Sequence, residues 1–262
     1  MVMRAAAVRV VRISERRGRG LVAARAVRAG DVVVEDRPIA IGADIAAPRC
    51  GTCAGVHDDD DAGRRACESD NAGRRWLAGI DWTSGPLFPA MAGELQIARI
   101  LGRINRVWDE GLSRLCHATI ADDHDGVRDD WRKVVARVTS LMSRGTAEDI
   151  LPFDTFRRLL GVLHLNCLAV GDADRHVGTV LMGTLSFVNH SCCPNAKVGA
   201  DFDRRGRLPL LAVDDIAEGD ELTIAYVDPT MPVDRRRRHL QWAYGFECDC
   251  RLCRQQLSSS KP

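Results

Sequence analysis

The chain has 262 residues, of which 45% are hydrophobic and 28% are charged, and its formal net charge at pH 7 is +1. This length and hydrophobic content suffice for one large domain or two small ones with a substantial core. The balanced charge excludes a global electrostatic attraction to nucleic acid or to an anionic membrane.

The N-terminal segment carries an arginine every few residues and has no continuous apolar stretch, so no secretory signal is predicted. An Arg-rich organelle-targeting segment is an alternative, but Arg4, Arg9 and Arg12 equally fit the polar positions of a strand. No window supplies the about 20 uncharged apolar residues that a membrane span needs. We therefore expect an intracellular protein of the nucleus or cytoplasm, without a membrane partner.

Residues 5–42 have the pattern of β structure. Val8, Val10 and Ile13 are apolar positions separated by arginines, and residues 16–20, Arg-Arg-Gly-Arg-Gly, predict a turn. The β-branched run 32–35 predicts a further strand, and Pro38 is expected to end it.

Residues 43–92 are irregular and hold an acidic run that is typical of a solvated loop. Residues 93–153 are helical in pattern, with apolar residues at helical spacing within 95–107 and 131–141. A further helix is predicted near 155–169, with Asp154 as its N-cap.

Short strands are expected within 177–227, followed by a helix that begins at the basic stretch 235–239. The order is β structure, a helical insert, β structure and a Cys-rich tail. Strands with a segregated helical block predict an α+β fold of short strands.

Three closely spaced cysteines, Cys248, Cys250 and Cys253, are the strongest local signal for a metal. Structural zinc takes four ligands in a tetrahedron, so a fourth ligand must come from elsewhere, and Cys192 or Cys193 is the obvious donor. A zinc there would tie the tail to residues 189–195. The alternative is three free thiols at a frayed chain end.

Three other features are ambiguous when taken singly. The polar segment 189–195, Asn-His-Ser-Cys-Cys-Pro-Asn, is typical of a turn, although its Asn and His side chains can also bind a ligand. Residues 18–20, Gly-Arg-Gly, fit a close approach to a cofactor or simply a tight turn. Tyr226 ends the strand-like run 221–226 and would ordinarily be a core tyrosine.

Taken together and in order, these residues resemble the SET-domain lysine methyltransferases, and among them the SET-and-MYND subfamily. The resemblance covers about 1–42 and 154–255. It is carried by RGRGL at 17–21, NCL at 166–168, SFVNHSCCPN at 186–195, AEGDELTIAYVD at 217–228 and YGFECDCRLC at 244–253.

The resemblance implies an S-adenosylmethionine-dependent protein-lysine N-methyltransferase. It implies Tyr226 as the active-site tyrosine, and it implies a structural zinc held by Cys192, Cys248, Cys250 and Cys253. The cofactor would be bound by Arg17, Gly18, Arg19, Gly20, Asn166, Asn189, His190 and Phe246. The lysine channel would be lined by Phe187, Ile224 and Tyr244.

The same resemblance divides the chain. It implies a SET core formed by 1–42 and 154–230, interrupted by a degenerate MYND position at 43–92 and a helical insert at 93–153. A post-SET zinc segment would follow at 231–255, and a disordered tail at 256–262.

The sequence departs from the subfamily in three ways. Only Cys50, Cys53, Cys67 and His57 occupy the position of the MYND finger, which needs seven cysteines and a histidine for two zincs. The C-terminal helical-repeat domain of many members does not follow Cys253. Ile224 stands where many SET enzymes carry Phe or Tyr, which favours room for more than one methylation.

Two other functions remain open on the sequence. One is a catalytically weak SET module that acts as a scaffold or reader. The other is a nucleic-acid adaptor that uses Arg235–Arg238, although this run is more typical of one face of a helix or of a nuclear signal. We expect a monomer whose partner is a protein with a target lysine, such as a histone tail, and no direct binding to nucleic acid.

Overall fold

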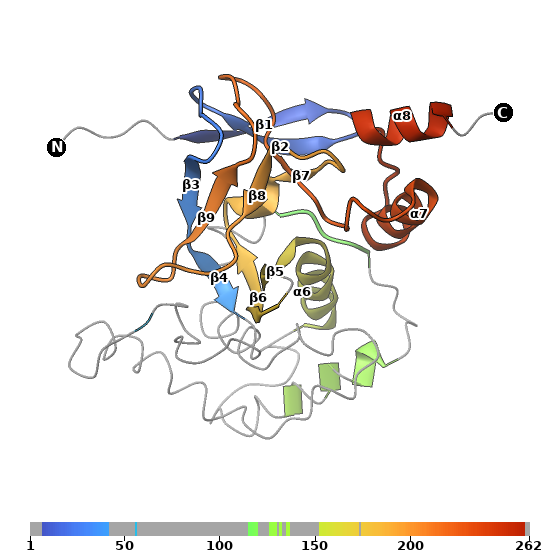
Figure 1. Cartoon of the computed structure of the whole chain (residues 1–262). Helices are drawn as coiled ribbons and strands as arrows, with labels where there is room; N and C mark the ends of the chain where they lie inside the picture. The colour runs from blue at the N-terminus through green and yellow to red at the C-terminus, as the bar shows by residue number, and fades with distance from the viewer. Residues whose placement is uncertain are drawn as a thin grey trace. The chain divides into compact units, whose positions relative to one another are not determined.

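A computed structural model describes residues 7–41, 56, 115–119, 126–129, 131–132, 135–136, 152–172 and 174–259 (Figure 1). The chain divides into two compact units. Unit 1 comprises residues 1–36, 187–199 and 208–262, and unit 2 comprises 37–186 and 200–207. The helix predicted within 95–107 and the candidate ligands Cys50, Cys53, Cys67 and His57 lie outside the described residues.

Unit 1 begins with a hairpin of β1 (Val8–Ser14) and β2 (Gly18–Ala23), which pair in antiparallel fashion. The turn predicted at 16–20 occupies 15–17, so its end was wrong by three residues, and residues 18–20 already belong to β2. The backbone N–H of Arg17 donates to Ser14 Oγ at 3.0 Å, which closes this turn. Gly18 has a φ of 64°, a left-handed conformation that favours glycine where the chain enters β2.

A three-stranded antiparallel sheet of unit 1 has the order β3 (Val32–Asp36), β9 (Leu208–Ala212) and β8 (Ala196–Val198). The alternating burial of β9 indicates that one face of this sheet packs on the core. The predicted strand at 32–35 is therefore confirmed. Pro38 does not end the β structure as expected, because it begins β4 (Pro38–Ile41), an edge strand where its missing N–H is tolerated.

A short parallel pair brings β7 (Asn189–His190) beside β10 (Thr223–Ile224). Asn195 fastens the two segments, because its Nδ2 donates to the Glu221 carbonyl at 2.9 Å and its Oδ1 accepts the Thr223 N–H at 2.9 Å. The strand-like run predicted to end at Tyr226 is shorter than expected. The ladder stops at Ile224, and the Tyr226 N–H bonds a side chain instead.

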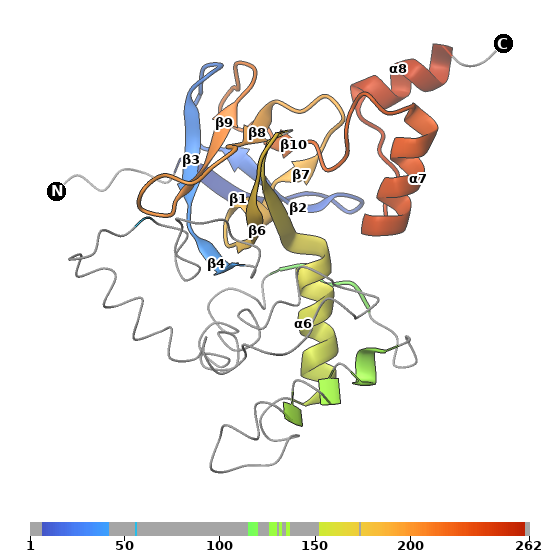
Figure 2. The same ribbon diagram turned by 60° about the horizontal axis from the view of Figure 1, so that its bottom comes forward.

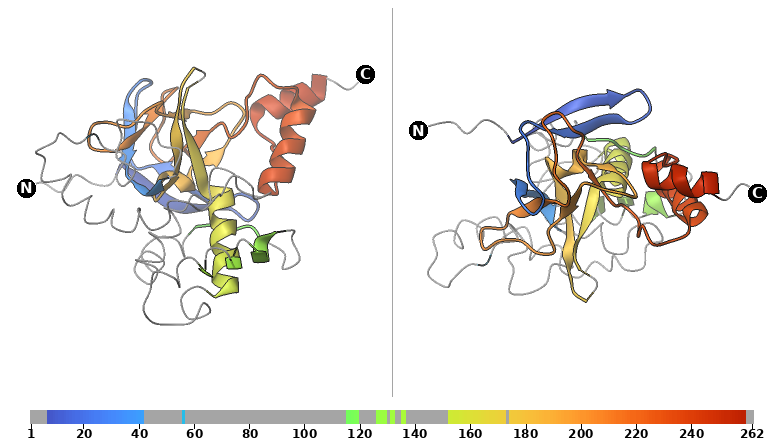
Figure 3. Two further views of the ribbon diagram at one scale, coloured as in Figure 1. Left: turned by 90° about the horizontal axis from the view of Figure 1, so that it is seen from below. Right: turned by 45° about the horizontal axis from the view of Figure 1, so that its top comes forward.

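The C-terminal part of unit 1 is helical. α7 (Val233–Tyr244) follows Pro232 and ends at Gly245, whose φ of 75° gives a left-handed C-cap. α8 (Arg251–Ser259) lies beside it (Figure 3). The helix predicted near 235–239 is confirmed. The disordered tail expected at 256–262 is wrong as far as Ser259, where α8 ends.

Unit 2 contains α6 (Phe153–Asn166), which leads directly into β5 (Cys167–Gly171) (Figure 2). Its sheet has the order β4, β6 (His176–Met182), β5, and a 3-10 turn (Leu185–Phe187) follows. The predicted helix near 155–169 is present but ends earlier, because Cys167 adopts an extended conformation that starts β5. Asp154 lies in the first turn of α6, and the N-cap position is occupied by Pro152 rather than by Asp154 as predicted.

The strands and segregated helices confirm the predicted α+β class. Among the described residues, no helix combines the length and apolar character that crossing a membrane requires.

Candidate functional site

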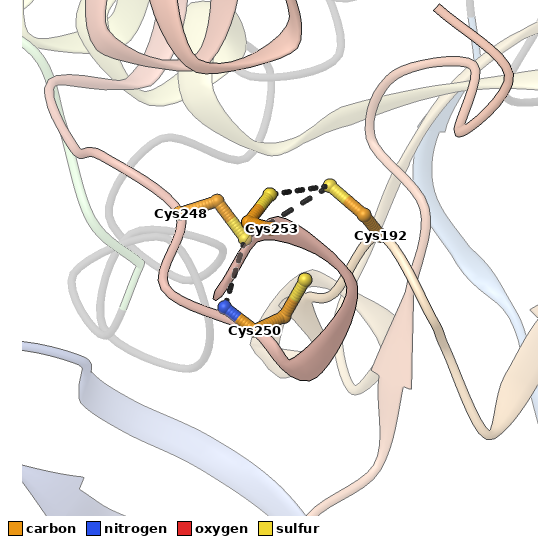
Figure 4. A group of neighbouring side chains, drawn as sticks. All are labelled: Cys192, Cys248, Cys250 and Cys253. Atoms are coloured by element: carbon orange, nitrogen blue, oxygen red, sulfur yellow. Dashed lines mark hydrogen bonds between the residues drawn. The ribbon is translucent and has the colours of Figure 1, made fainter. Parts of the chain in front are cut away.

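Four cysteine side chains of unit 1 converge on one point, and we call them the cysteine cluster: Cys192, Cys248, Cys250 and Cys253 (Figure 4). Their sulfur atoms all lie within 4.8 Å of one another, and the Cys192 sulfur is 3.9 Å from that of Cys248 and 3.6 Å from that of Cys253. Sulfurs bound tetrahedrally to zinc at about 2.3 Å would be about 3.8 Å apart. The cluster therefore has the donor set and the spacing for one structural zinc.

The structure also chooses between the two candidate fourth donors. Cys192 is 2% exposed and joins the cluster, whereas the Cys193 sulfur lies 3.5 Å from Ser191 Oγ.

Burial raises the proton affinity of two of these thiols. It raises the pKa of Cys248 to about 11 and raises the pKa of Cys192 as well. The pKa of Cys250 falls to about 6, because hydrogen bonds from the backbones of Cys253 and Cys192 and from neighbouring thiols outweigh the effect of its burial. A coordinated thiol is deprotonated outright, so a bound zinc would replace these protons.

Four rings of unit 1 form a closed circuit that we call the aromatic cluster: His190, Tyr226, Tyr244 and Phe246. Ring centroids are separated by 5.3 Å for His190 and Tyr226, 4.9 Å for Tyr226 and Tyr244, 6.4 Å for Tyr244 and Phe246, and 6.0 Å for Phe246 and His190. Each pair is tilted rather than stacked. His190 is buried, whereas the other three rings are partly exposed and so accessible to a ligand.

His190 links the two clusters. Burial, together with the positive charges of Arg17 and Arg236, lowers the pKa of His190 to about 4, so its ring is neutral near pH 7. Its Nδ1 accepts the Tyr226 N–H at 3.0 Å, which places the single ring proton on Nε2. That nitrogen lies 3.3 Å from the Cys192 sulfur. The side chain thus holds the backbone of Tyr226 and donates toward a cluster sulfur.

The hydroxyl of Tyr226 donates to the Val188 carbonyl at 2.7 Å. This bond and the His190 contact fix both ends of the tyrosine. Burial raises the pKa of the neighbouring Tyr244 phenol, which keeps that hydroxyl protonated.

Glu221 organises the polar residues beside the hairpin and was missed from the sequence. Its carboxylate pairs with Arg17 at 2.9 Å and accepts the Asn189 amide N–H at 2.9 Å. Arg17 also donates to the His190 carbonyl at 3.3 Å, and Asn189 donates to the Arg19 carbonyl at 3.1 Å. The only signal in the sequence was an acidic residue at the start of a strand-like run, which is too common to stand out.

Gly20 is required by close packing. A Cβ there would lie 2.6 Å from the Ile13 side chain and 2.7 Å from Asn189 Nδ2. The neighbouring Arg19 places its guanidinium 5.1 Å from the centroid of the Phe187 ring. Residues 17–20 therefore contact both Asn189 and Phe187 within unit 1.

Two other predicted site residues, Asn166 and Ile224, are buried. Asn166 belongs to unit 2, where its amide donates to the carbonyls of Cys116 at 2.7 Å and Val162 at 2.6 Å. Ile224 is 5% exposed within β10 of unit 1.

A family model for the SET domain matches residues 18–227. The chain belongs to the SET domain family. This family assignment confirms the resemblance stated from the motifs, and the relatives below agree with the SET-and-MYND type.

The chain is similar to histone-lysine N-methyltransferases. It is 39% identical to human SMYD3 over 105 residues, which is 40% of this chain and 24% of that protein. It is 27% identical to mouse Smyd1 over 279 residues, 93% of this chain and 55% of that protein. It is 34% identical to SET5 of Meyerozyma guilliermondii over 112 residues, which is 42% of this chain and 21% of that protein. The chain thus spans about half of these relatives' length or less.

Among solved structures, the chain is similar to the SET domain of LSMT bound to lysine and AdoHcy. The TM-score is 0.50 at 17% sequence identity, covering 94% of this chain and 54% of that one. At this identity the likeness concerns the fold, and it confirms the predicted SET fold.

Proposed function

We propose that this SET-domain chain is an S-adenosylmethionine-dependent protein-lysine N-methyltransferase. The observation that carries the proposal is the aromatic cluster around Tyr226, held in a chain whose family membership is established. Similarity to three histone-lysine methyltransferases supports the same reaction class.

The cofactor would lie against the hairpin turn and segment 189–190, with Phe246 stacked on its adenine. When bound, it supplies an electrophilic methyl on a sulfonium. Phe246 fits this role because its ring is only half-buried. Asn189 and His190 already bond the protein through their side chains, so we assign them a positioning role. Arg17, Gly18, Arg19 and Gly20 would shape the adjoining wall, and the role of Asn166 stays a prediction.

The substrate lysine would enter beside Tyr226, with Tyr244, Phe187 and Ile224 as the channel walls. An apolar, desolvated channel lowers the pKa of a lysine amine, which favours the neutral nucleophile. Tyr226, fixed at its backbone and hydroxyl, would orient that amine toward the methyl group. Alignment of two bound reactants contributes about 7 kcal/mol in favourable cases. The reaction needs no covalent enzyme intermediate.

The cysteine cluster would bind one structural zinc. Four protein sulfurs complete the tetrahedron and leave no open position for a substrate, which is typical of a structural site. Tyr244 and Phe246 come just before Cys248 in the chain, so the metal would hold two rings of the aromatic cluster in place.

The substrate is proposed to be a protein lysine, including those of histone tails, and the site of action the nucleus or cytoplasm. The monomeric state and the absence of nucleic-acid binding stay predictions. The same holds for the earlier division of the chain into SET, MYND-position and post-SET segments.

The test is transfer of a radiolabelled methyl group from S-adenosylmethionine to histones and to a whole lysate, with Tyr226→Phe as the matched control. We expect labelled protein with the wild type and little with the variant. Calorimetry with S-adenosylhomocysteine runs in parallel. Cofactor binding without any transfer would contradict the enzyme and leave the scaffold.

A further inference from the structure

The basic run at the start of α7 contains one residue that does not face solvent. Arg235 and Arg238 are exposed and Arg237 is half-buried, whereas Arg236 is 0% exposed. Four residues later, Leu240 is also 0% exposed, so both lie on one face of the helix. A buried arginine needs partners for its charge and its donors, because an uncompensated buried cation is costly.

Each of the five N–H donors of Arg236 has an acceptor. Nε donates to the Cys192 sulfur at 3.3 Å. Nη2 donates to the Cys253 sulfur at 3.8 Å and to Gln256 Oε1 at 2.6 Å. Nη1 donates to the carbonyls of Pro229, at 3.0 Å, and Met231. The guanidinium therefore joins the loop after Tyr226, the segment after β7 and helix α8.

The partners of Arg236 also indicate which negative charge its guanidinium would offset. Within the part of the chain that the structure describes, no carboxylate forms an ion pair with Arg236, and its charge reaches the carboxylate of Asp228 only at longer range. The sulfurs are the only groups capable of carrying charge that accept its hydrogen bonds. Four thiolates around Zn²⁺ carry a net charge of −2. The buried guanidinium would offset half of that charge, and its N–H groups would stabilise the thiolate form of Cys192 and Cys253.

We propose that Arg236 is a positioning residue of the zinc site, which retains the metal by donating N–H···S bonds to Cys192 and Cys253 and by offsetting the charge of the thiolates. The proposal rests on the zinc site of the proposed function. Outer hydrogen-bond partners of metal ligands typically contribute 10- to 100-fold to metal affinity. Arg236 would act on catalysis only indirectly, by keeping the tail that carries Tyr244 and Phe246 in place.

The experiment compares the full chain with Arg236→Met, Arg236→Lys and the exposed control Arg238→Met. Zinc per chain is measured by elemental analysis, and metal affinity by competition with a chromogenic chelator. Cobalt(II) replaces zinc in a second assay, because its sulfur-to-metal charge-transfer band reports hydrogen bonding to the thiolates. Circular dichroism of each metal-loaded variant reports folding.

We expect R236M to lose about 10- to 100-fold in zinc and cobalt affinity, with a charge-transfer band at lower energy. R236K keeps the charge but lacks the planar five-donor fork, so its affinity should be intermediate. R238M should match the wild type. Folded R236M with wild-type affinity and an unshifted band would overturn the proposal. If R236M does not fold, wild-type affinity and band energy in R236K would overturn it instead. A wild-type chain without zinc would contradict the zinc site itself, which is a separate outcome.

Discussion

The cysteine cluster and the aromatic cluster lie in the same unit and share the tail from Tyr244 to Cys253, but they are built in different ways. The cysteine sulfurs converge within 4.8 Å, and three of the four residues are at most 5% exposed. The aromatic rings stand 4.9 to 6.4 Å apart at tilted angles, and three of them are half-buried. The first region is closed around a single point, as a structural metal site must be, whereas three residues of the second are partly exposed.

The two clusters are joined through His190, which contacts the Cys192 sulfur and accepts the Tyr226 N–H. The comparison can therefore be tested by damaging one region and measuring the other. A closed metal site should affect both zinc content and activity when it is broken. Damage to the aromatic cluster should lower activity and leave the zinc content unchanged.

The largest effect is expected from Cys250→Ser. This change removes one of four zinc ligands, so the zinc content should fall from about one per chain to near zero and methyl transfer should fall with it. Elemental analysis and a thermal melt measure the two losses. Cys193→Ser is the control, because its sulfur lies outside the cluster, and it should keep the metal. Full zinc content in Cys250→Ser would refute the four-cysteine site.

Tyr226→Phe should lower kcat by about 100-fold or more, because it removes a preorganised hydroxyl from the reacting centre. Zinc content and the affinity for S-adenosylhomocysteine should not change, since the backbone bond to His190 stays. Single-turnover methyl transfer, elemental analysis and calorimetry separate these quantities. A variant with wild-type kcat would remove Tyr226 from the reaction.

Glu221→Gln should weaken S-adenosylhomocysteine binding by about tenfold, which corresponds to about 1.4 kcal/mol. The change removes the negative charge that holds Arg17 while keeping the shape of the side chain. Calorimetry is the measurement, and the exposed Glu218→Gln is the matched control. Equal affinity in the two variants would show that the network does not shape the cofactor site.

Phe246→Leu should give the smallest effect, a loss of about fivefold in S-adenosylhomocysteine affinity, because an aromatic contact is worth about 1 kcal/mol beyond its buried area. Trp242→Leu serves as the control, since this side chain is 80% exposed on α7. A loss in both variants would indicate a general effect on the tail rather than stacking on the cofactor.

Much of this arrangement was predictable from local patterns. Cys248, Cys250 and Cys253 are so closely spaced that a metal site follows from their positions alone, and the ordered motifs led to the SET fold. Boundaries were less predictable. The helix α6 ends at Asn166 because Cys167 is drawn into a strand pairing with β6, and helical periodicity alone does not reveal such a competitor.

Arg236, within the basic run 235–238, shows the same limit of prediction from local sequence patterns. The sequence pattern was interpreted as one face of a helix or a nuclear signal, yet Arg236 shares a helix face with Leu240 and is fully buried. The i to i+4 spacing from a leucine was the available signal. It was outweighed by the usual exposure of arginine.

The sequence by itself determined the family, the α+β class and, by their spacing, three donors of the proposed zinc site. Through the family resemblance it also gave Tyr226 as the active-site tyrosine and Cys192 as the fourth donor, both as hypotheses. The tertiary structure decided that Cys192 rather than Cys193 completes the cluster, that Glu221 joins Arg17 to Asn189, and that Arg236 contacts two sulfurs. The reason is physical. These contacts join residues that lie far apart along the chain, and local propensity and spacing do not specify which side chains meet when such segments pack together.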